Sequence, residues 1–464
     1  MSRYRPLATM TMAKALYCRS EKWSAATAYQ AILSMPHERE LERKCLSLAS
    51  ELIKIPSLTP ITAELASVAA RSLDCLQAFL EASGAECHRL TFEGGHEKWG
   101  YPVDNLFAEW PGDDALGHLC FIGHTDVVPP GDPNLWRFDP FCGCIQDGFL
   151  CGRGATDMKG AVAAFCAAAA AFALNAGRPR PKVGLIVTTD EEWAAINGTR
   201  KVLDWMRMGG RTPTAFLVGE PSSPMELGSH IKVGRRGSLS GTIQVKGVQG
   251  HTAYPNLFEN PNRALALALT VLNSHIWDDA SEIMPATAFE VVALTSGSFD
   301  STAIIPGEAR ALWNIRYTPQ QTLVGLLTKL ENLLDDLPKW ARSHPDSTKL
   351  GHVMIRGHTD VASVPYCSEP SSFARLVTNA VAANIGRIPV ADAGGGTTDG
   401  RFVHAVFPHA QIVELGPPEG CGGKDGLQID GGMHQPDERC SIVDLGLMAR
   451  CYASILGAFG RSAS

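Results

Sequence analysis

Three short and almost uninterrupted apolar runs mark the first half of the chain, at residues 119–122, 183–187 and 215–218. Such runs are typical of central strands in a sheet that helices cover on both faces. The longest apolar run, residues 161–174, is rich in alanine and too short to span a bilayer, so it predicts a buried helix. This first pattern indicates an α/β domain.

The pattern changes after Val233. Apolar and polar side chains then alternate in three segments, which are residues 238–246, 288–294 and 308–317. Alternation of this kind predicts strands with one face in solvent. Two amphipathic helical stretches, residues 261–274 and 320–334, separate these segments. The order of strands and helices predicts a small ferredoxin-like domain inserted into the larger one.

A chain of 464 residues exceeds the size of one ordinary hydrophobic core, so we expect more than one domain. The boundaries that we predict are 1–40 for an N-terminal extension, 41–232 and 347–464 for the two parts of the larger domain, and 233–346 for the insertion. The extension has only positive charges before Glu21. That pattern fits a transit peptide or a disordered extension, and equally a start codon assigned too early, ahead of Met35.

Composition narrows the classes of function. The net charge of −7 predicts no nucleic-acid partner, and the local pair Arg235-Arg236 suits a substrate carboxylate better than a phosphate backbone. The 13 cysteines are an odd number without a C-x-x-C pair, and Cys142 and Cys144 have no second pair to complete a structural zinc site. We therefore expect a reduced, cytoplasmic protein that binds neither nucleic acid nor membrane.

Five polar segments carry the candidate chemistry. They are Gly123–Asp126, Gly154–Gly160, Thr189–Glu192, Gly219–Ser222 and His434–Glu438. Together they supply two imidazoles and several carboxylates, a mixture of nitrogen and oxygen donors that suits a pair of zinc-like ions. Several of them follow the apolar runs directly, and the carboxyl ends of strands meet at one edge of an α/β sheet. The ligand set predicts a two-metal hydrolase.

Ordinary structural roles compete with this interpretation for several residues. His124 also fits a histidine satisfied by a backbone carbonyl in a turn, with Asp126 beside it. Asp157, just before a predicted helix, also fits an N-cap. Glu220 before a proline is weak evidence when taken alone. His434 is stronger, because a second ion needs a second imidazole.

Glu191 and Glu192 are consecutive carboxylates at the end of a predicted strand. Adjacent side chains of an extended backbone face opposite ways, so one carboxylate can hold metal while the other acts as general base. A solvated acidic turn is the competing interpretation. The buried strand that precedes the pair favours the functional one.

Two more histidines need assignment. His251, flanked by glycine on a loop of the inserted domain, fits a hydrogen-bond donor to an oxyanion better than a metal ligand. Residues 357–361 repeat residues 123–127 letter for letter, but only the first copy follows a buried apolar run. We assign the second copy to the inserted domain and predict that its histidine, His358, binds no metal. The chain has neither a G-x-S-x-G nor a G-x-x-x-x-G-K motif.

Over residues 41–456 this ordered set resembles the dinuclear zinc aminoacylase and carboxypeptidase family. The longest matches are residues 123–131, 152–160, 189–199, 217–223, 233–241, 248–255 and 395–402. The resemblance implies a zinc-peptidase-like α/β catalytic domain with helices on both faces of a mixed sheet. It also implies that the inserted ferredoxin-like domain is a dimerisation or lid domain.

The same resemblance implies a ligand set for two zinc ions, with cobalt or manganese as substitutes. His124 and Glu220 would hold one ion, Glu192 and His434 the other, and Asp157 would bridge them.

Further roles follow from the resemblance. Asp126 would support His124, and Glu191 would be the general base and acid. His251 would reach the partner subunit's site and stabilise the oxyanion, which implies a homodimer through the inserted domain. The positions that match contacts to substrate carboxylates are Arg235, Arg316 and Thr397.

Within the family, the motifs are most similar to those of enzymes that hydrolyse N-succinyl-L,L-2,6-diaminopimelate to succinate and L,L-2,6-diaminopimelate, in lysine and diaminopimelate biosynthesis. Four features depart from that pattern: Trp193, Ala303, Asp430 and the glycine-rich segment 419–432. The departures affect substrate recognition, so a sister hydrolase for N-acetyl amino acids or dipeptides is the alternative. A catalytically silent homologue that binds metal or amino acids is the less favoured one.

Overall fold

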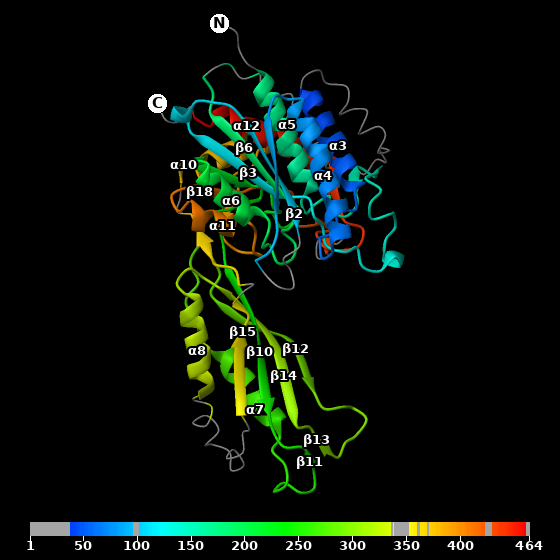
Figure 1. Cartoon of the computed structure of the whole chain (residues 1–464), viewed down its shortest axis with the longest axis vertical. Coiled ribbons are helices and arrows are strands. Elements are labelled where there is room, and N and C mark those ends of the chain that lie inside the picture. Colours follow the sequence, from blue (N-terminus) through cyan, green and yellow to red (C-terminus); the bar gives the residue numbers. More distant parts are fainter. Residues whose placement is uncertain are drawn as a thin grey trace.

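A computed structural model describes residues 38–95, 102–175, 177, 179–335, 337, 352–359, 362–368, 371–422 and 429–460. Residues 1–37 of the predicted extension lie outside the described residues, as do Asp360 and Val361 of the repeated motif and residues 423–428 of the glycine-rich segment. The chain forms a larger lobe and a smaller, elongated one, and the two are joined end to end (Figure 1).

The larger lobe is built on an eight-stranded mixed sheet in the order β1-β2-β6-β3-β7-β18-β8-β17. The strands are β1 (Glu86–Phe92), β2 (Val103–Trp110), β6 (Lys182–Thr188), β3 (His118–His124), β7 (Ala215–Val218), β18 (Gln411–Glu414), β8 (His230–Lys232) and β17 (Val390–Asp392). The three apolar runs of the sequence form β6, β3 and β7, which are parallel neighbours at the centre. Strands β1 and β2 are antiparallel to their neighbours.

Helices cover both faces of this sheet, as predicted. One face packs against α3 (Glu38–Ile53), α4 (Ala63–Glu81), α5 (Lys159–Asn175), α10 (Ser372–Ile385) and α12 (Ile442–Ala458). The other face packs against α6 (Thr199–Met208) and α11 (Gly400–Val406). Strand β3 serves both layers, because Leu119 and Phe121 face the first cluster while Cys120 and Ile122 face the second.

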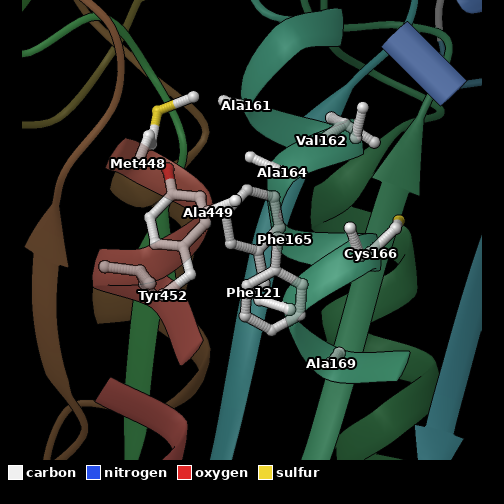
Figure 2. Close-up of a cluster of buried hydrophobic side chains, with 14 of the residues drawn as sticks. Phe121, Ala161, Val162, Ala164, Phe165, Cys166, Ala169, Met448, Ala449 and Tyr452 are labelled. Carbon is white, nitrogen blue, oxygen red and sulfur yellow. The ribbon is translucent and has the colours of Figure 1, made fainter. Parts of the chain in front are cut away.

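The alanine-rich run forms α5, whose residues 159–170 are all buried. Its small side chains let α12 and the sheet approach closely, and its Phe165 fills the centre of the contact (Figure 2). The ring of Phe165 stacks on Phe121 with centroids 4.3 Å apart and meets Tyr452 of α12 edge-on at 5.9 Å. This packing fixes the position of α5, which begins two residues after Asp157.

Three antiparallel strands form a small additional sheet beside the main one: β4 (Ile145–Gln146), β5 (Phe149–Cys151) and β21 (Arg439–Ser441). Strand β5 precedes the Gly154–Gly160 segment, and β21 follows the His434–Glu438 segment. The pairing of β5 with β21 therefore brings two of the five predicted ligand segments together, although they are far apart in the chain. Shorter elements of this lobe are the 3-10 turns Asp114–Leu116 and Pro133–Leu135 and the strand pair β19 (Cys421–Gly422) and β20 (Ile429–Asp430).

The smaller lobe is a four-stranded antiparallel sheet with two helices. Its elements in chain order are β10 (Gly237–Lys246), α7 (Pro261–Ser274), β12 (Ala288–Ser296), β14 (Glu308–Tyr317), α8 (Leu323–Asp335) and β15 (His352–Gly357). The sheet order β12-β14-β10-β15, antiparallel throughout, is the ferredoxin-like arrangement that the sequence predicted. Because β15 completes this sheet, the lobe extends beyond residue 346, where we had placed its end. The hydrogen bonds of β15 to β10 decide this boundary.

Short strands lie at the two ends of the smaller lobe. At the junction of the lobes, β9 (Gly234–Arg235) pairs with β16 (Tyr366–Cys367). At the far tip, β11 (Gly250–His251) pairs with β13 (Ile304–Ile305) (Figure 1). Among the described helices, none combines the length and apolar character that a membrane crossing requires.

Candidate metal centre

The ends of three central strands place the first group of candidate ligands. His124 is the last residue of β3, and it pairs in register with Thr188, the last residue of β6. Glu191 and Glu192 lie in the bend after β6, and Glu220 lies two residues beyond the end of β7. Since the three strands are parallel neighbours, all these side chains emerge at one edge of the sheet.

The carboxylate of Asp157 lies between two imidazoles. Its Oδ1 is 3.2 Å from Nε2 of His124, and its Oδ2 is 3.4 Å from Nε2 of His434. Glu220 approaches His124 Nε2 to 3.5 Å, and both carboxylate oxygens of Glu192 lie 3.2 Å from His434 Nε2. Thus each of the two histidines faces one carboxylate of its own, and the two share Asp157.

This donor set fits metal ions. Two groups have ligand atoms that all lie within 4.8 Å of one another: His124 with Asp157 and Glu192, and His124 with Glu191 and Glu220. Four carboxylates and two imidazoles gather at this edge and carry an excess of negative charge, with His434 exposed and His124 buried. Such a cluster is costly without cations, and nitrogen and oxygen donors of this kind bind zinc and similar ions.

The electrostatics of the metal-free cluster reflect the same crowding. Burial lowers the pKa of His124, but the neighbouring Asp157 and Glu220 outweigh it and raise this pKa well above its ordinary value. Hydrogen bonds to Asp157 and Glu192 raise the pKa of His434 to about 10. Burial, followed by the nearby Asp157, raises the pKa of Glu220 to about 7. The carboxylates thus favour positive charge at both imidazoles.

Asp126 organises the turn that carries the two glutamates. Its carboxylate is fully buried and accepts the main-chain N–H of Glu191 at 3.2 Å and of Glu192 at 3.1 Å. It also accepts a hydrogen bond from the hydroxyl of Thr59. The Nδ1 atom of His124 lies 2.9 Å from the main-chain oxygen of Asp126, which leaves Nε2 facing the carboxylates. Asp126 therefore orients both the histidine and the Glu-Glu bend.

The sequence did not reveal the role of Glu438 and Arg153. Glu438 is completely buried, and its Oε1 accepts the main-chain N–H groups of Gly154, Thr156 and Asp157 at 3.0–3.2 Å. Its other oxygen accepts a hydrogen bond from Arg153 at 2.6 Å, and the guanidinium of Arg153 also donates to the main-chain oxygen of His434 at 3.4 Å. The pair therefore fixes the Asp157 segment to the His434 segment. Two features of the sequence could have indicated this role. One is the charged residue between the glycines of Gly152-Arg153-Gly154, and the other is the acidic residue four positions after His434.

Glu191 lies in a mixed electrostatic environment. Burial, followed by the charges of Glu220 and Asp399, raises its pKa well above the ordinary range. Arg401 of α11 opposes this effect, with Nη1 3.9 Å from the Glu191 carboxylate. Arg401 was not among the residues that the sequence singled out, because its place depends on how α11 packs.

The three predicted substrate contacts lie around the junction of the lobes. Arg235 is buried, and its guanidinium donates to Glu414, to the main-chain oxygen of Gly394 at 3.1 Å and to that of Pro221 at 3.4 Å. Arg316, on β14, has a buried Nη1 that finds no hydrogen-bond partner among the residues that the structure describes. Burial, Arg236 and Arg401 lower the pKa of Arg316, so these cations lie within electrostatic range of one another. Thr397 is half-buried in the loop between β17 and α11.

The remaining predicted residues lie elsewhere. His251 is exposed on β11 at the far tip of the smaller lobe, away from the metal cluster of its own chain (Figure 1). His358 follows β15 in the sheet of the smaller lobe, where its main-chain N–H bonds to Ser240. Trp193 is 63% exposed next to Glu192. Asp430 faces Arg439 at 2.9 Å and Arg137 at 3.7 Å.

A covered mixed sheet with histidines and carboxylates converging at its strand ends defines a metal-dependent hydrolase. The model of peptidase family M20/M25/M40 matches residues 120–458, and the chain belongs to this family. It is 40% identical over 416 residues to the succinyl-diaminopimelate desuccinylase of Rhodospirillum centenum, covering 89% of this chain and 96% of the relative.

Solved structures share the fold at low sequence identity. Human carnosine dipeptidase 1 superposes with a TM-score of 0.70 at 16% identity, covering 94% of this chain and 99% of that one. A dinuclear metal-binding peptidase of the M20 family from Bacillus subtilis superposes with a TM-score of 0.60 at 14% identity, covering 90% and 98% of the two chains. Both comparisons support the α/β fold with its second, smaller domain.

Proposed function

We propose that this protein hydrolyses N-succinyl-L,L-2,6-diaminopimelate to succinate and L,L-2,6-diaminopimelate, a step in lysine and diaminopimelate biosynthesis. The observation that carries the proposal is the Asp157 carboxylate between His124 and His434, the arrangement that two adjacent metal ions require. The substrate is supported by the relative from Rhodospirillum centenum, which bears the desuccinylase name and matches almost the whole described chain.

The metal ions that we propose are two zinc ions per subunit, for which cobalt or manganese can substitute. His124 and Glu220 would hold one, Glu192 and His434 the other, and Asp157 would contact both. Bound at these positions, zinc would supply Lewis acidity and lower the pKa of a bound water to about 7.

Glu191 is the proton carrier in this proposal. Burial and the neighbouring acids raise the pKa of its carboxyl group above the ordinary value, which favours a group that must accept a proton and later return it. It takes a proton from the attacking water and later delivers that proton to the amine that leaves. The Asp126 carboxylate holds the main-chain N–H of Glu191, so the base keeps its direction throughout.

His251 would act in the site of a second copy of the chain. Its position at the tip of the smaller lobe, far from the metal cluster of its own chain, supports a role across a homodimer rather than within one subunit (Figure 1). There its imidazole would donate a hydrogen bond to the oxyanion that forms on the amide carbonyl. This arrangement requires a homodimer through the smaller lobe.

The substrate carboxylates need cations, and Arg316 is the better supported candidate. Its buried Nη1, which has no hydrogen-bond partner within the described part of the chain, is a donor that a carboxylate can satisfy. Arg235 directs its donors to Glu414, Gly394 and Pro221, so a direct contact with substrate requires that it leave those partners. Through Gly394, Arg235 holds the loop that leads to Thr397.

A sister specificity is the second candidate. Asp430 places a carboxylate, engaged by Arg439, where an amide is typical of the desuccinylase pattern, and Ala303 lacks a hydrogen-bonding side chain. Both changes favour an acyl group with fewer polar contacts than succinyl. Such an enzyme would use the same metal centre on an N-acetyl amino acid or a dipeptide.

The test is a substrate panel with zinc-loaded protein. We expect hydrolysis of N-succinyl-L,L-2,6-diaminopimelate with a kcat/KM at least tenfold above the N-acetyl and dipeptide analogues. Preference for an analogue would move the protein to the sister specificity. No turnover of any N-acyl amino acid with both metals bound would overturn the enzymatic assignment. Cytoplasmic localisation remains a prediction, which cell fractionation tests.

A further inference from the structure

Two cysteine thiols lie in contact in a loop that the proposed chemistry does not use. Cys142 and Cys144 flank Gly143 in the segment before β4, and their sulfur atoms are 2.7 Å apart. The main-chain N–H of Cys144 points to the sulfur of Cys142 at 3.3 Å. Both residues are partly exposed, whereas Cys45, Cys120 and Cys166 are buried in the core.

The backbone holds the two side chains on the same side. Gly143 has a φ of +54°, in the left-handed region that favours glycine. A Cβ at this position would come within 2.5 Å of the main-chain oxygen of Ser50 in α3, so no other residue fits. The hydroxyl of Ser50 also donates to the main-chain oxygen of Gly143 at 2.7 Å. The turn is therefore fixed by α3 and does not depend on a bond between the sulfurs.

The distance between the sulfurs favours a disulfide over a metal chelate. A disulfide bond is about 2.05 Å long, so the sulfurs need to approach by only about 0.7 Å. Two cysteine sulfurs on one tetrahedral zinc, with bonds of about 2.3 Å, would lie about 3.8 Å apart. The sulfur atoms therefore move less to form a disulfide than to bind one zinc ion together.

We propose that Cys142 and Cys144 form a reversible dithiol–disulfide site that low-molecular-weight disulfides such as glutathione disulfide oxidise. The thiolate of one cysteine attacks a sulfur of glutathione disulfide, which releases one glutathione and leaves a mixed disulfide on the protein. The thiolate of the other cysteine then attacks that protein sulfur and releases the second glutathione. The protein loses two electrons and two protons, and one glutathione disulfide becomes two thiols.

The loop is joined to the strand that leads to the metal centre. The main-chain N–H of Cys151 donates to the oxygen of Cys144 at 2.8 Å, and the N–H of Arg153 donates to the oxygen of Pro140 at 2.7 Å. The disulfide site is therefore next to the segment that carries Asp157. The proposal does not depend on the substrate of the enzyme, so its failure would leave the proposed function unaffected.

Tryptic peptide mapping of the full-length, metal-loaded protein tests the site. The protein is equilibrated in glutathione buffers of increasing oxidation, quenched with acid, alkylated and digested. Cleavage after Arg137 and Arg153 gives one peptide that contains Cys142, Cys144 and Cys151. We expect an oxidised peptide that lacks two hydrogens, carries alkyl label only on Cys151 and regains the other two labels after reduction.

Single variants sharpen the assignment. Cys144→Ser should abolish the internal disulfide, and Cys142→Ser should accumulate a glutathione adduct on Cys144. The matched control Cys151→Ser, in the same peptide, should close the ring as the wild type does. A disulfide that includes Cys151, or full alkylation of all three thiols where the exposed Cys367 is already glutathionylated, would overturn the proposal.

Discussion

Arg153 and Glu438 form a buried ion pair that joins two segments of the metal centre, with Arg153 Nη1 2.6 Å from Glu438 Oε2. Their side chains are 2% and 0% exposed, so water does not compensate either charge. Glu438 also receives three main-chain N–H groups around Asp157, and Arg153 reaches the main chain of His434. This pair therefore fixes the distance between the carboxylate of Asp157 and the imidazole of His434.

Replacing Glu438 by glutamine should therefore weaken both the fold and the metal centre. Breaking a buried pair while one charge remains costs about 3–5 kcal/mol of unfolding free energy, and loss of an outer support lowers metal affinity by about 10–100-fold. Urea denaturation and a zinc titration against a chelator measure the two effects. The matched control is Asp74→Asn, which breaks the exposed pair with Arg89 and should leave both quantities almost unchanged. Unaltered zinc affinity in Glu438→Gln would contradict the bracing role.

Glu191→Gln should separate proton transfer from metal binding. The amide keeps the size of the side chain but cannot accept a proton, so we expect kcat to fall by about 10²–10⁴-fold while two zinc ions per subunit remain. Glu192→Gln is the comparison, since the neighbouring carboxylate faces His434 and its loss should reduce the zinc content. Kinetics and metal analysis of both variants decide the assignment. Loss of metal from Glu191→Gln would make Glu191 a ligand.

Zinc binding to metal-free protein should release protons and strengthen with pH. The pKa of His434 is raised to about 10, so its imidazole is protonated at pH 7 and must lose that proton before Nε2 can bind a metal. Affinity should therefore rise as the pH rises towards 10, where His434 loses this proton. Calorimetry in two buffers of different ionisation enthalpy counts the protons. His434→Ala should release at least one proton fewer, and equal release by both proteins would contradict this account.

Mixing two inactive variants tests whether His251 serves the partner subunit. In a heterodimer of His251→Ala with Glu191→Gln, one site carries both defects and the other carries neither if His251 acts across the dimer. Random mixing makes half of the dimers hybrid, so about one quarter of wild-type activity should return. If His251 acted within its own subunit, every site would retain a defect and no activity would return. Gel filtration of the wild type checks that a dimer exists.

Arg316→Ala should raise KM with little change in kcat. The guanidinium that would meet a substrate carboxylate is lost while Glu191 and the metal ligands stay in place, and we expect a KM increase of about 10–100-fold. Arg310→Ala is the matched control on the same strand, because that side chain is 60% exposed and pairs with Glu308. Steady-state kinetics with the succinyl substrate measure both variants. An unchanged KM for Arg316→Ala would remove this residue from the site.

Local sequence patterns were enough for much of the fold. The apolar runs became β3, β6 and β7, the alanine-rich run became α5, and the alternating segments became β10, β12 and β14. Period and apolar content are properties of consecutive residues, so burial on one or both faces can be inferred without knowing the partner. The last strand of the smaller lobe, β15, falls outside the predicted boundary at residue 346, because only its pairing with β10 assigns it to that sheet.

The candidate metal centre also has features that local sequence patterns predict and features that only tertiary contacts determine. The sequence by itself determined which histidines and carboxylates follow buried strands, and the structure brings His124, Asp157, Glu192, Glu220 and His434 to one edge. Only the tertiary structure decided that Glu438 braces Asp157, that Arg235 is held by Glu414, and that His251 lies far from the candidate metal ligands of its own chain. Each of these relationships depends on residues that are far apart in the chain or that lie in different lobes. A buried charge needs a partner that packing supplies, and nothing in the local pattern of residues specifies which partner that is.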